Sequence, residues 1–350
     1  MAYTTIDNPE LYFQTKLYTG TGSSLAITLD GSENMQPDWV WIKNRNLSGG
    51  YGHSIFDSVR GVNKKLVSNA GSSESSLTST FNSFDTDGFT LGADSQTDEV
   101  NKSSASQVSW NWKAGGSAAN NTDGNTTTSV SVNQTAGFSI MKYAGDGNES
   151  TIGHGLGAEP EYIIFKEIDG GESWRVWSKY TPDTASKALA LNLTDAAFSQ
   201  TNWIGTISSS IITIGSDSSI NTSGNNYIAY AFAPKKGYSK FGSYTGNGNA
   251  DGTFVYTGFK PAFIMVKGTN ESNQDWAIFD NKRDPINKVT QRIQPSSSAE
   301  ESGGQDIDFL SNGIKFRVSG AFINGSYNYI YMAFAESPFV TSTGIPTTAR

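Results

Sequence analysis

Most apolar stretches of the chain alternate between two faces with a period of two residues. In "YIAYAFAP", for example, Ile228, Tyr230 and Phe232 fall on one face of an extended strand and the residues between them on the other. Few stretches show the spacing that is typical of a helix. Turn sequences such as "DG", "GN" and "NG" separate the apolar runs at short intervals. The pattern therefore predicts an all-β protein built from short strands.

One apolar stretch occurs in three versions. "PDWVWIK" begins at Pro37, "PEYIIFK" at Pro160 and "PAFIMVK" at Pro261. Each version places an aromatic residue third, apolar residues after it and a lysine seventh. We predict a repeated structural motif, because internal repeats of this kind mark repeated structural units. Its shared positions are Pro37, Trp39, Lys43, Pro160, Tyr162, Lys166, Pro261, Phe263 and Lys267.

Other motifs repeat in the same order around this stretch. Each repeat opens with a tyrosine and a glycine-rich turn, which read "YTGTG", "YAGDG" and "YTGNG". Each contains a second aromatic strand, namely "HSIFDSVRG", "WRVWSKYTP" or "WAIFDNKRDP", and closes on "VSWNWKAGG", "YIAYAFAP" or "YIYMAFAESP". The agreement of several motifs in order predicts three tandem repeats of about 100 residues, which is the size of a compact domain.

The repeats set the expected domain boundaries. We expect each repeat to be a β-sandwich or a jelly-roll-like domain. A polar stretch rich in Gly, Asn and Thr is expected to link the first two. The expected order is a terminal arm at 1–13, domains at 14–116, 137–234 and 238–338 with the linker at 117–136, and a terminal arm at 339–350. The sequence leaves open whether the domains touch, and whether the arms tie chains together or lie loose.

The two tryptophans of the first motif have two interpretations. Trp39 and Trp41 share one face of the predicted strand with Lys43, and exposed indole rings would form a platform for a sugar ring. In the other repeats, however, Ile164 and Met265 stand where the first has Trp41. A buried position tolerates such exchanges better than a sugar platform does. We therefore favour a core strand whose lysine reaches the strand edge.

The partners of the repeated lysines are either carboxylates or the carbonyl groups at strand ends. Asp57 and Asp280 occupy matching positions in "HSIFD" and "WAIFD", whereas the second repeat has Ser178 there. These two aspartates are candidate partners of the motif lysine in the same repeat. Alternatively, each of them caps the turn that follows its strand.

The candidate catalytic and metal-binding residues favour structural roles. His53 stands where the other repeats have Trp174 and Trp276, so we expect a packing position, and His154 lies in the glycine-rich loop "TIGHGLG". No hydrolase or zinc-protease motif accompanies either histidine. "DTDG" at 85–88 lacks the later ligands of a calcium loop and predicts a β-turn. We expect no enzyme, no cofactor and no metal; a depolymerase that uses an unrecognised pair of carboxylates is the weakest alternative.

Composition restricts the kinds of partner. The net charge is −8, and the basic stretches "VNKKL" and "PKKG" are too short for a nucleic-acid groove. The apolar run "YNYIYMAFA" is too short for a membrane span, and the first residues are not expected to form a signal peptide. The chain has no cysteine, which excludes disulfides and thiol chemistry.

Several of these stretches together resemble one family. "LYTGTG", "PDWVWIKNR", "HSIFDSVRG", "FDTDGFTLG" and "WNWKAGG" in the first repeat, with "FKPAFIMVK" and "YIYMAFAESP" in the third, resemble virion proteins of tailed bacteriophages, especially phages of marine bacteria. The resemblance covers nearly the whole chain and is looser in the second repeat. It implies a structural component of the particle, described as tail-fibre-like or capsid-associated, and it supplies no catalytic residues.

The sequence therefore predicts a non-enzymatic structural protein of a phage virion, assembled in the host bacterial cytoplasm. It would act as a capsid decoration or tail-appendage component, through multivalent packing against other virion proteins or copies of itself. The alternative is a receptor-binding tail-fibre protein that recognises a host-surface glycan through loops such as "YAGDGNES" and "SGNNY". Capsid or tail location, copy number and oligomeric state stay open.

Overall fold

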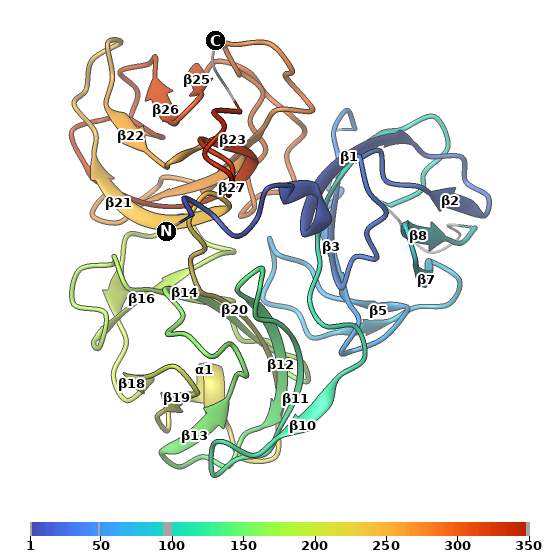
Figure 1. The fold of residues 1–350 in the computed structure, drawn as a ribbon. Helices are drawn as coiled ribbons and strands as arrows, with labels where there is room; N and C mark the ends of the chain where they lie inside the picture. The colour runs from blue at the N-terminus through green and yellow to red at the C-terminus, as the bar shows by residue number, and fades with distance from the viewer. Residues whose placement is uncertain (1, 48–49, 94–99, 348–350) are drawn as a thin grey trace.

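The structure, a computed structural model, describes residues 2–47, 50–93 and 100–347 and consists mainly of antiparallel strands. The all-β class predicted from the alternating pattern is confirmed. Figure 1 shows three lobes around a common centre, coloured blue, green and orange in chain order. Parts of the predicted first repeat (48–49 and 94–99) and of the predicted terminal arms (1 and 348–350) lie outside the described residues.

The first lobe combines a four-stranded sheet in the order β1-β9-β3-β4 with a three-stranded sheet in the order β2-β8-β7. A short 3-10 helix, Pro9–Leu11, precedes it. The strands are β1 (Phe13–Thr19), β2 (Leu25–Ile27), β3 (Trp39–Asn44), β4 (His53–Asp57), β5 (Lys64–Lys65), β6 (Ser75–Ser76), β7 (Phe81–Asp85), β8 (Gly88–Leu91) and β9 (Ser106–Trp112).

The second lobe has the same two groups of strands, in the orders β12-β20-β14-β15 and β13-β19-β18, and extends the first group at both edges. Its elements are β10 (Ala119–Asn121), β11 (Thr128–Asn133), β12 (Phe138–Ala144), β13 (Ser150–Gly153), β14 (Tyr162–Glu167), β15 (Arg175–Ser178), β16 (Lys187–Ala190), β17 (Phe198–Ser199), β18 (Ile204–Ile207), β19 (Ile211–Ile214), α1 (Ser218–Asn221) and β20 (Asn226–Phe232).

The third lobe repeats the arrangement with sheets in the orders β21-β27-β23-β24 and β22-β26-β25. Its strands are β21 (Ser239–Thr245), β22 (Phe254–Tyr256), β23 (Phe259–Gly268), β24 (Ala277–Asp280), β25 (Ile307–Leu310), β26 (Gly313–Phe316) and β27 (Asn328–Pro338). The motif strands β3, β14 and β23 therefore occupy the same third place in their four-stranded arrangements.

Each lobe is a two-layer sandwich with its own apolar core. In the first lobe, Val40 and Ile42 of β3 pack with Phe81, Phe89 and Leu91 of the smaller sheet. Corresponding clusters fill the second and third lobes. The alternation of side chains along a strand explains this, because every second residue of the motif strand points toward the smaller sheet.

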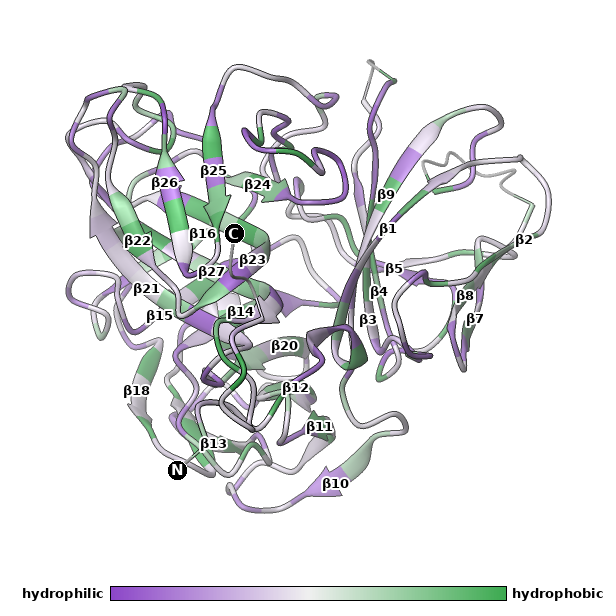
Figure 2. Cartoon of the chain, turned by 45° about the horizontal axis from the view of Figure 1, so that its top comes forward, coloured by the Kyte–Doolittle hydropathy of each residue, from purple (hydrophilic) through white to green (hydrophobic). Residues whose placement is uncertain are grey.

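The opposite faces of the three larger sheets meet in one central core. This cluster contains Trp39 and Trp41 of the first lobe, Tyr162 of the second, and Phe263 and Met265 of the third. The motif strands are thus buried on both faces, which explains why β3 and β14 contain only buried residues. Figure 2 shows hydrophobic residues along the strands that meet at this centre and mostly polar residues along the outer loops.

Aromatic rings connect every pair of lobes in the central core. Trp39 of the first lobe lies 5.9 Å from Phe232 of the second, measured between ring centroids. Trp112 lies 5.6 Å from Phe334 of the third lobe, and Phe232 lies 5.9 Å from the same ring. Rings at these separations attract one another beyond the gain from burial. The three lobes therefore form one packed body.

The stretch at 117–136, expected to be a linker, contains β10 and β11. Strand β11 pairs with β12 in the register Val130↔Met141, and β10 continues the sheet outward. The polar composition of this stretch concealed a period-two pattern, in which Val130 contributes to the apolar core of the second lobe. A strand of an antiparallel sheet can be largely polar where one face of the sheet is exposed to solvent.

The predicted terminal arms fold back onto the body. Ile6 lies in the central core, and the hydroxyl of Thr4 donates a hydrogen bond to the carbonyl of Lys236 at 2.7 Å. The backbone N–H of Ser342 donates to Asp7 at 2.6 Å, which joins the two ends of the chain. The described parts of both ends are therefore anchored within the same chain.

The shared core generates a prediction about unfolding. Heating should unfold all three lobes in one transition, because separating any lobe exposes the aromatic face of its larger sheet to water. Differential scanning calorimetry should give a van't Hoff enthalpy equal to the calorimetric enthalpy. Three separate transitions, or a stable monomeric fragment of residues 117–234, would contradict this prediction.

Candidate functional site

The prolines and aromatic residues of the repeated motif lie in the interior. Pro37 and Pro160 are buried just before their strands, where the missing N–H leaves no ladder bond unmade. Pro261 lies inside β23 at an irregularity in its pairing with β27. Trp39, Tyr162 and Phe263 are each 1% exposed, so none of them is a surface platform for a ligand.

The three motif lysines are fully buried and donate to backbone carbonyls. Lys43 donates to the carbonyls of Asn44, Tyr51 and Ser298, at distances from Nζ of 3.0, 2.8 and 3.2 Å. Ser298 belongs to the third lobe, so this ammonium group connects two lobes. Of the two candidate types of partner, strand-end carbonyls are therefore the ones observed.

The lysines of the other two lobes bind carbonyls in the same way. Lys166 donates to the carbonyls of Glu167 at 2.6 Å and Gly170 at 3.4 Å. Lys267 donates to Gln274 and, across the lobe boundary, to Thr194 at 3.1 Å. Burial lowers the pKa of both Lys166 and Lys267 to about 8, because removing an ammonium ion from water disfavours its charged form.

A cycle of hydrogen bonds connects the lobes next to these lysines. His53 pairs with Lys43 across β3 and β4, and its Nε2 lies 3.0 Å from the carbonyl of Gln294 in the third lobe. Trp174 donates from the second lobe to the carbonyl of Val67 in the first, at 2.8 Å. Trp276 donates from the third lobe to the carbonyl of Ala190 in the second, also at 2.8 Å.

In the first lobe, His53 makes the interlobe hydrogen bond that a tryptophan makes in each of the other two lobes, and Trp41 fixes its tautomer. The indole N–H of Trp41 donates to Nδ1 of His53 at 2.8 Å, so Nδ1 is an acceptor and the ring proton belongs on Nε2. Nε2 then donates to Gln294, as the indole nitrogen does in the other lobes. This pairing explains why the first lobe has a tryptophan where the others have Ile164 and Met265.

Two buried charged networks also join the lobes. Asp57 accepts hydrogen bonds from Arg60 Nε at 2.5 Å and from the hydroxyl of Tyr230, in the second lobe, at 2.7 Å. Its other oxygen accepts the backbone N–H groups of Val59 and Arg60, which is the turn cap proposed from the sequence. Arg60 also donates to Glu74 at 3.1 Å.

Asp280 repeats this network at the boundary between the third and first lobes. It accepts from Arg283 Nε at 2.6 Å and from the indole N–H of Trp110, in the first lobe, at 3.0 Å. Arg283 continues to Glu301 at 3.1 Å, and Glu301 in turn binds Arg45 of the first lobe through both carboxylate oxygens.

The second lobe has no counterpart of this charged network. The third lobe, which adjoins it there, has no matching hydrogen-bond donor. Trp110, Tyr230 and Met332 stand opposite Trp41, Ile164 and Met265, the equivalent residues of the motif strands. The thioether of Met332 cannot donate a hydrogen bond. Ser178 replaces the aspartate at the corresponding boundary, which avoids a buried carboxylate without a donor from the neighbouring lobe.

Sequence reasoning missed a third set of repeated polar residues. Asn101, Asn221 and Asn324 are fully buried, and each side chain fastens the glycine-rich turn that opens its lobe. Their amide oxygens accept the backbone N–H groups of Thr21, Asp146 and Asn247, at 2.9, 2.9 and 3.3 Å. The signal was present as "VNKS", "INTS" and "INGS", in which a branched apolar residue precedes Asn and Ser follows two residues later.

The remaining residues singled out in the sequence have local partners. His154 is buried, and its ring nitrogens lie 3.2 Å from the backbone N–H of Leu156 and 3.2 Å from the carbonyl of Ser208. "DTDG" forms the tight connection between β7 and β8, in which Gly88 has a φ of 100° that only glycine adopts readily. Within the described ranges no three His, Asp or Glu side chains are grouped to hold a metal, and no helix is long and apolar enough to cross a membrane.

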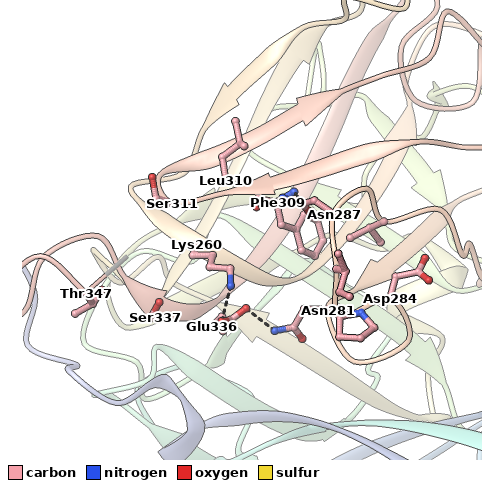
Figure 3. A pocket seen from close by; sticks show the side chains of 13 residues that line it. Lys260, Asn281, Asp284, Asn287, Phe309, Leu310, Ser311, Glu336, Ser337 and Thr347 are labelled. Carbon is pink, nitrogen blue, oxygen red and sulfur yellow. Dashed lines mark hydrogen bonds and ion pairs between the residues drawn. The ribbon is translucent and has the colours of Figure 1, made fainter. Parts of the chain in front are cut away.

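A surface hollow lies on the third lobe. It has a volume of about 710 Å³ and is bounded by the start of β23, the end of β27, the segment after β24 and the turn after β25. In Figure 3, Lys260, Glu336 and Asn281 form a hydrogen-bonded row across it. Lys260 Nζ lies 2.7 Å from one oxygen of Glu336, and Asn281 Nδ2 donates to the other at 2.7 Å.

A second hollow of about 290 Å³ adjoins the first and reaches the boundary with the first lobe. Both are lined by Lys260, Asn281, Pro285 and Glu336, so they form one continuous depression. We call this depression the third-lobe groove. None of its charged residues was singled out in the sequence, because they become neighbours only when β23, β24 and β27 come together.

A model of one protein family matches residues 8–338, and its description is Domain of unknown function (DUF7483). The chain belongs to this family. The matched span includes all three lobes, so the DUF7483 unit corresponds to the whole body rather than to a single repeat. No curated protein and no solved structure matches the chain.

The charged networks of this DUF7483 chain generate a prediction about stability. Replacing Asp57 by Ala should lower the free energy of unfolding by about 3–5 kcal/mol, because Arg60 loses its buried carboxylate and Tyr230 its acceptor. Replacing Ser178 by Ala should cost only about 1 kcal/mol, because a neutral hydroxyl is lost. Denaturant titration measures both values, and equal losses would contradict the assignment.

The buried histidine generates a prediction about pH. Burial first, and then the charge of Lys43, lower the pKa of His53 well below its ordinary value; Arg283 is a further cation nearby, while the carbonyls of Gln294 and Ser297 act in the opposite direction. The unfolded chain therefore binds a proton near pH 6.5 that the folded chain does not bind. Below that pH, His53 should cost stability at about 1.4 kcal/mol per pH unit, and above it the effect should vanish.

The variant His53→Gln removes this titration and retains hydrogen-bonding groups. Its free energy of unfolding between pH 6.5 and 5 should fall less steeply than that of the unmodified chain, by about the slope given above. Burial lowers the pKa of His154 as well, so the double variant His53→Gln with His154→Gln should flatten the profile further than His53→Gln alone. Parallel pH profiles for the unmodified chain and His53→Gln would show that His53 is not buried in its neutral form.

Proposed function

We propose that the chain is a non-enzymatic structural protein of a tailed-phage particle, either a capsid decoration or a component of a tail appendage. The observation that carries the proposal is the shared central core, which holds three lobes of equivalent strand order around one centre. A single chain thereby presents three similar surfaces in a fixed arrangement. Such a body suits a three-fold or quasi-three-fold position in a symmetric assembly.

The use of the buried titratable groups supports a structural role. His53, Asp57 and Asp280, the residue types from which catalytic sites are usually built, all serve to join one lobe to the next. The sequence resemblance to phage virion proteins extends through the first and third lobes, including the strands that form the core. Repeated weak contacts on one particle would add up to stable attachment.

Deletion of the gene from a phage that encodes the chain tests this proposal. Purified particles should then lack the protein in mass spectrometry, and cryo-electron microscopy should show density missing at a capsid or tail position. Re-expression from a plasmid should restore the density. Purified wild-type particles that contain none of the protein would overturn the proposal, as would mutant particles with unchanged composition.

A further inference from the structure

We propose that the third-lobe groove is a binding site for a neutral oligosaccharide. In the loop "YAGDGNES", which suggested glycan binding in the sequence, several polar groups bind the chain itself. Asn221, for example, holds the turn "YAGDG" through Asp146 and Asn148. The groove, in contrast, presents polar side chains beside open space. It lies in the third lobe, whereas this loop belongs to the second. The inference does not depend on a phage origin.

The size of the groove fits a ligand of several sugar rings. Its larger part measures about 710 Å³, which falls within the range of roughly 300–1,000 Å³ that is typical of ligand sites. The smaller part continues it along the boundary with the first lobe, past Gln14 and Thr15. Two adjoining open hollows suit a chain of linked rings better than a compact metabolite.

The polar groups of the groove match the hydroxyl groups of a sugar. The side chains of Lys260 and Glu336 are 36% and 35% exposed, so a ligand can reach both. A hydroxyl group both donates and accepts hydrogen bonds, as does this row of ammonium, carboxylate and amide groups.

The charges of the groove favour a neutral ligand. Lys260 and Glu336 neutralise each other at 2.7 Å. Lys282 lies near Asp30 of the first lobe at 3.7 Å, and Asp284 accepts hydrogen bonds from Thr290 and Gln291 of its own loop. An anionic ligand would therefore meet lysines that are already paired with carboxylates, whereas a neutral hydroxylated ligand needs no net charge.

An apolar margin complements the polar row. Pro285, Ile286 and Leu310 line the larger part of the groove, and Ile286 is 79% exposed. The carbon-bound hydrogens of a pyranose ring offer a matching apolar face, and ligand sites typically combine such surfaces with a few oriented polar groups. In Figure 3, Leu310 of this margin lies across the depression from Glu336.

The shared architecture does not require these residues. By alignment of the motif prolines and the paired strands, Lys260, Asn281 and Glu336 correspond to Glu159, Lys179 and Pro234 in the second lobe. There, Lys179 and Glu159 form an exposed ion pair at 3.3 Å instead. The row of Lys260, Glu336 and Asn281 is thus specific to the third lobe, as expected for a site and not for a folding requirement.

The test uses the full chain and isothermal titration calorimetry. The probes are hexasaccharides of glucose in α and β linkage, of galactose and of N-acetylglucosamine, with a hexamer of galacturonic acid as the acidic comparison. At least one neutral probe should bind below about 10 mM. The variants Asn281→Ala, Glu336→Gln and Ile286→Ser should each weaken that binding by about tenfold or more.

Lys179→Ala is the matched control, because it changes the equivalent position of the second lobe and should leave binding unchanged. Circular dichroism melting should show that all four variants fold like the unmodified chain, since the altered side chains lie at the surface or at the edge of the groove. The proposal is overturned if no neutral probe binds, if only the acidic hexamer binds, or if the groove variants bind normally. Capture of peptides from a random library, lost in the groove variants while sugars fail to bind, would assign the groove to a protein partner instead.

Discussion

The fold depends on the burial of three motif strands on both of their faces. One face of each strand packs against the smaller sheet of its own lobe, and the other contributes to the central core. A strand in an isolated sandwich would leave that second face to solvent, and an alternating polar pattern would suffice there. The aromatic residues Trp39, Tyr162 and Phe263 are therefore required by the assembly of three lobes, which explains why all three copies retain them.

Directional contacts fix how the lobes are oriented around this core. Apolar packing is tolerant of small rotations, but a buried donor needs its acceptor at one distance and angle. His53, Trp174 and Trp276 each reach a carbonyl of a different lobe, and Asp57 and Asp280 add two charged junctions. Because an unpaired buried group is costly, donors and acceptors at a boundary depend on each other across lobes. At the boundary between the second and third lobes, which has no charged network, Ser178 stands in place of the acceptor and Met332 in place of the donor.

The interlobe contacts and the proposed oligosaccharide site occupy different parts of the molecule. The interior uses histidine, aspartate and lysine to bind neighbouring backbone and side chains, whereas the third-lobe groove is a surface feature of one lobe. Residues at equivalent positions of the second lobe show that the shared architecture is maintained without the groove. A body with three similar lobes can therefore carry a specific site on one of them while its core stays common to all.

The sequence by itself determined the all-β class and the two faces of its apolar strands, and it predicted three corresponding repeats. These properties are local, because alternation along a strand decides which side chains share a face. It also indicated that Trp39 and Trp41 are buried, since Ile164 and Met265 replace one of them. It missed β10 and β11, whose apolar positions are few, and it could not choose between carboxylates and carbonyls as partners of the lysines. Only the tertiary structure decided these partners, as well as the lobe contacts and the groove: His53 and Gln294 are 241 residues apart in the chain, and no local pattern encodes which distant carbonyl a buried donor will meet.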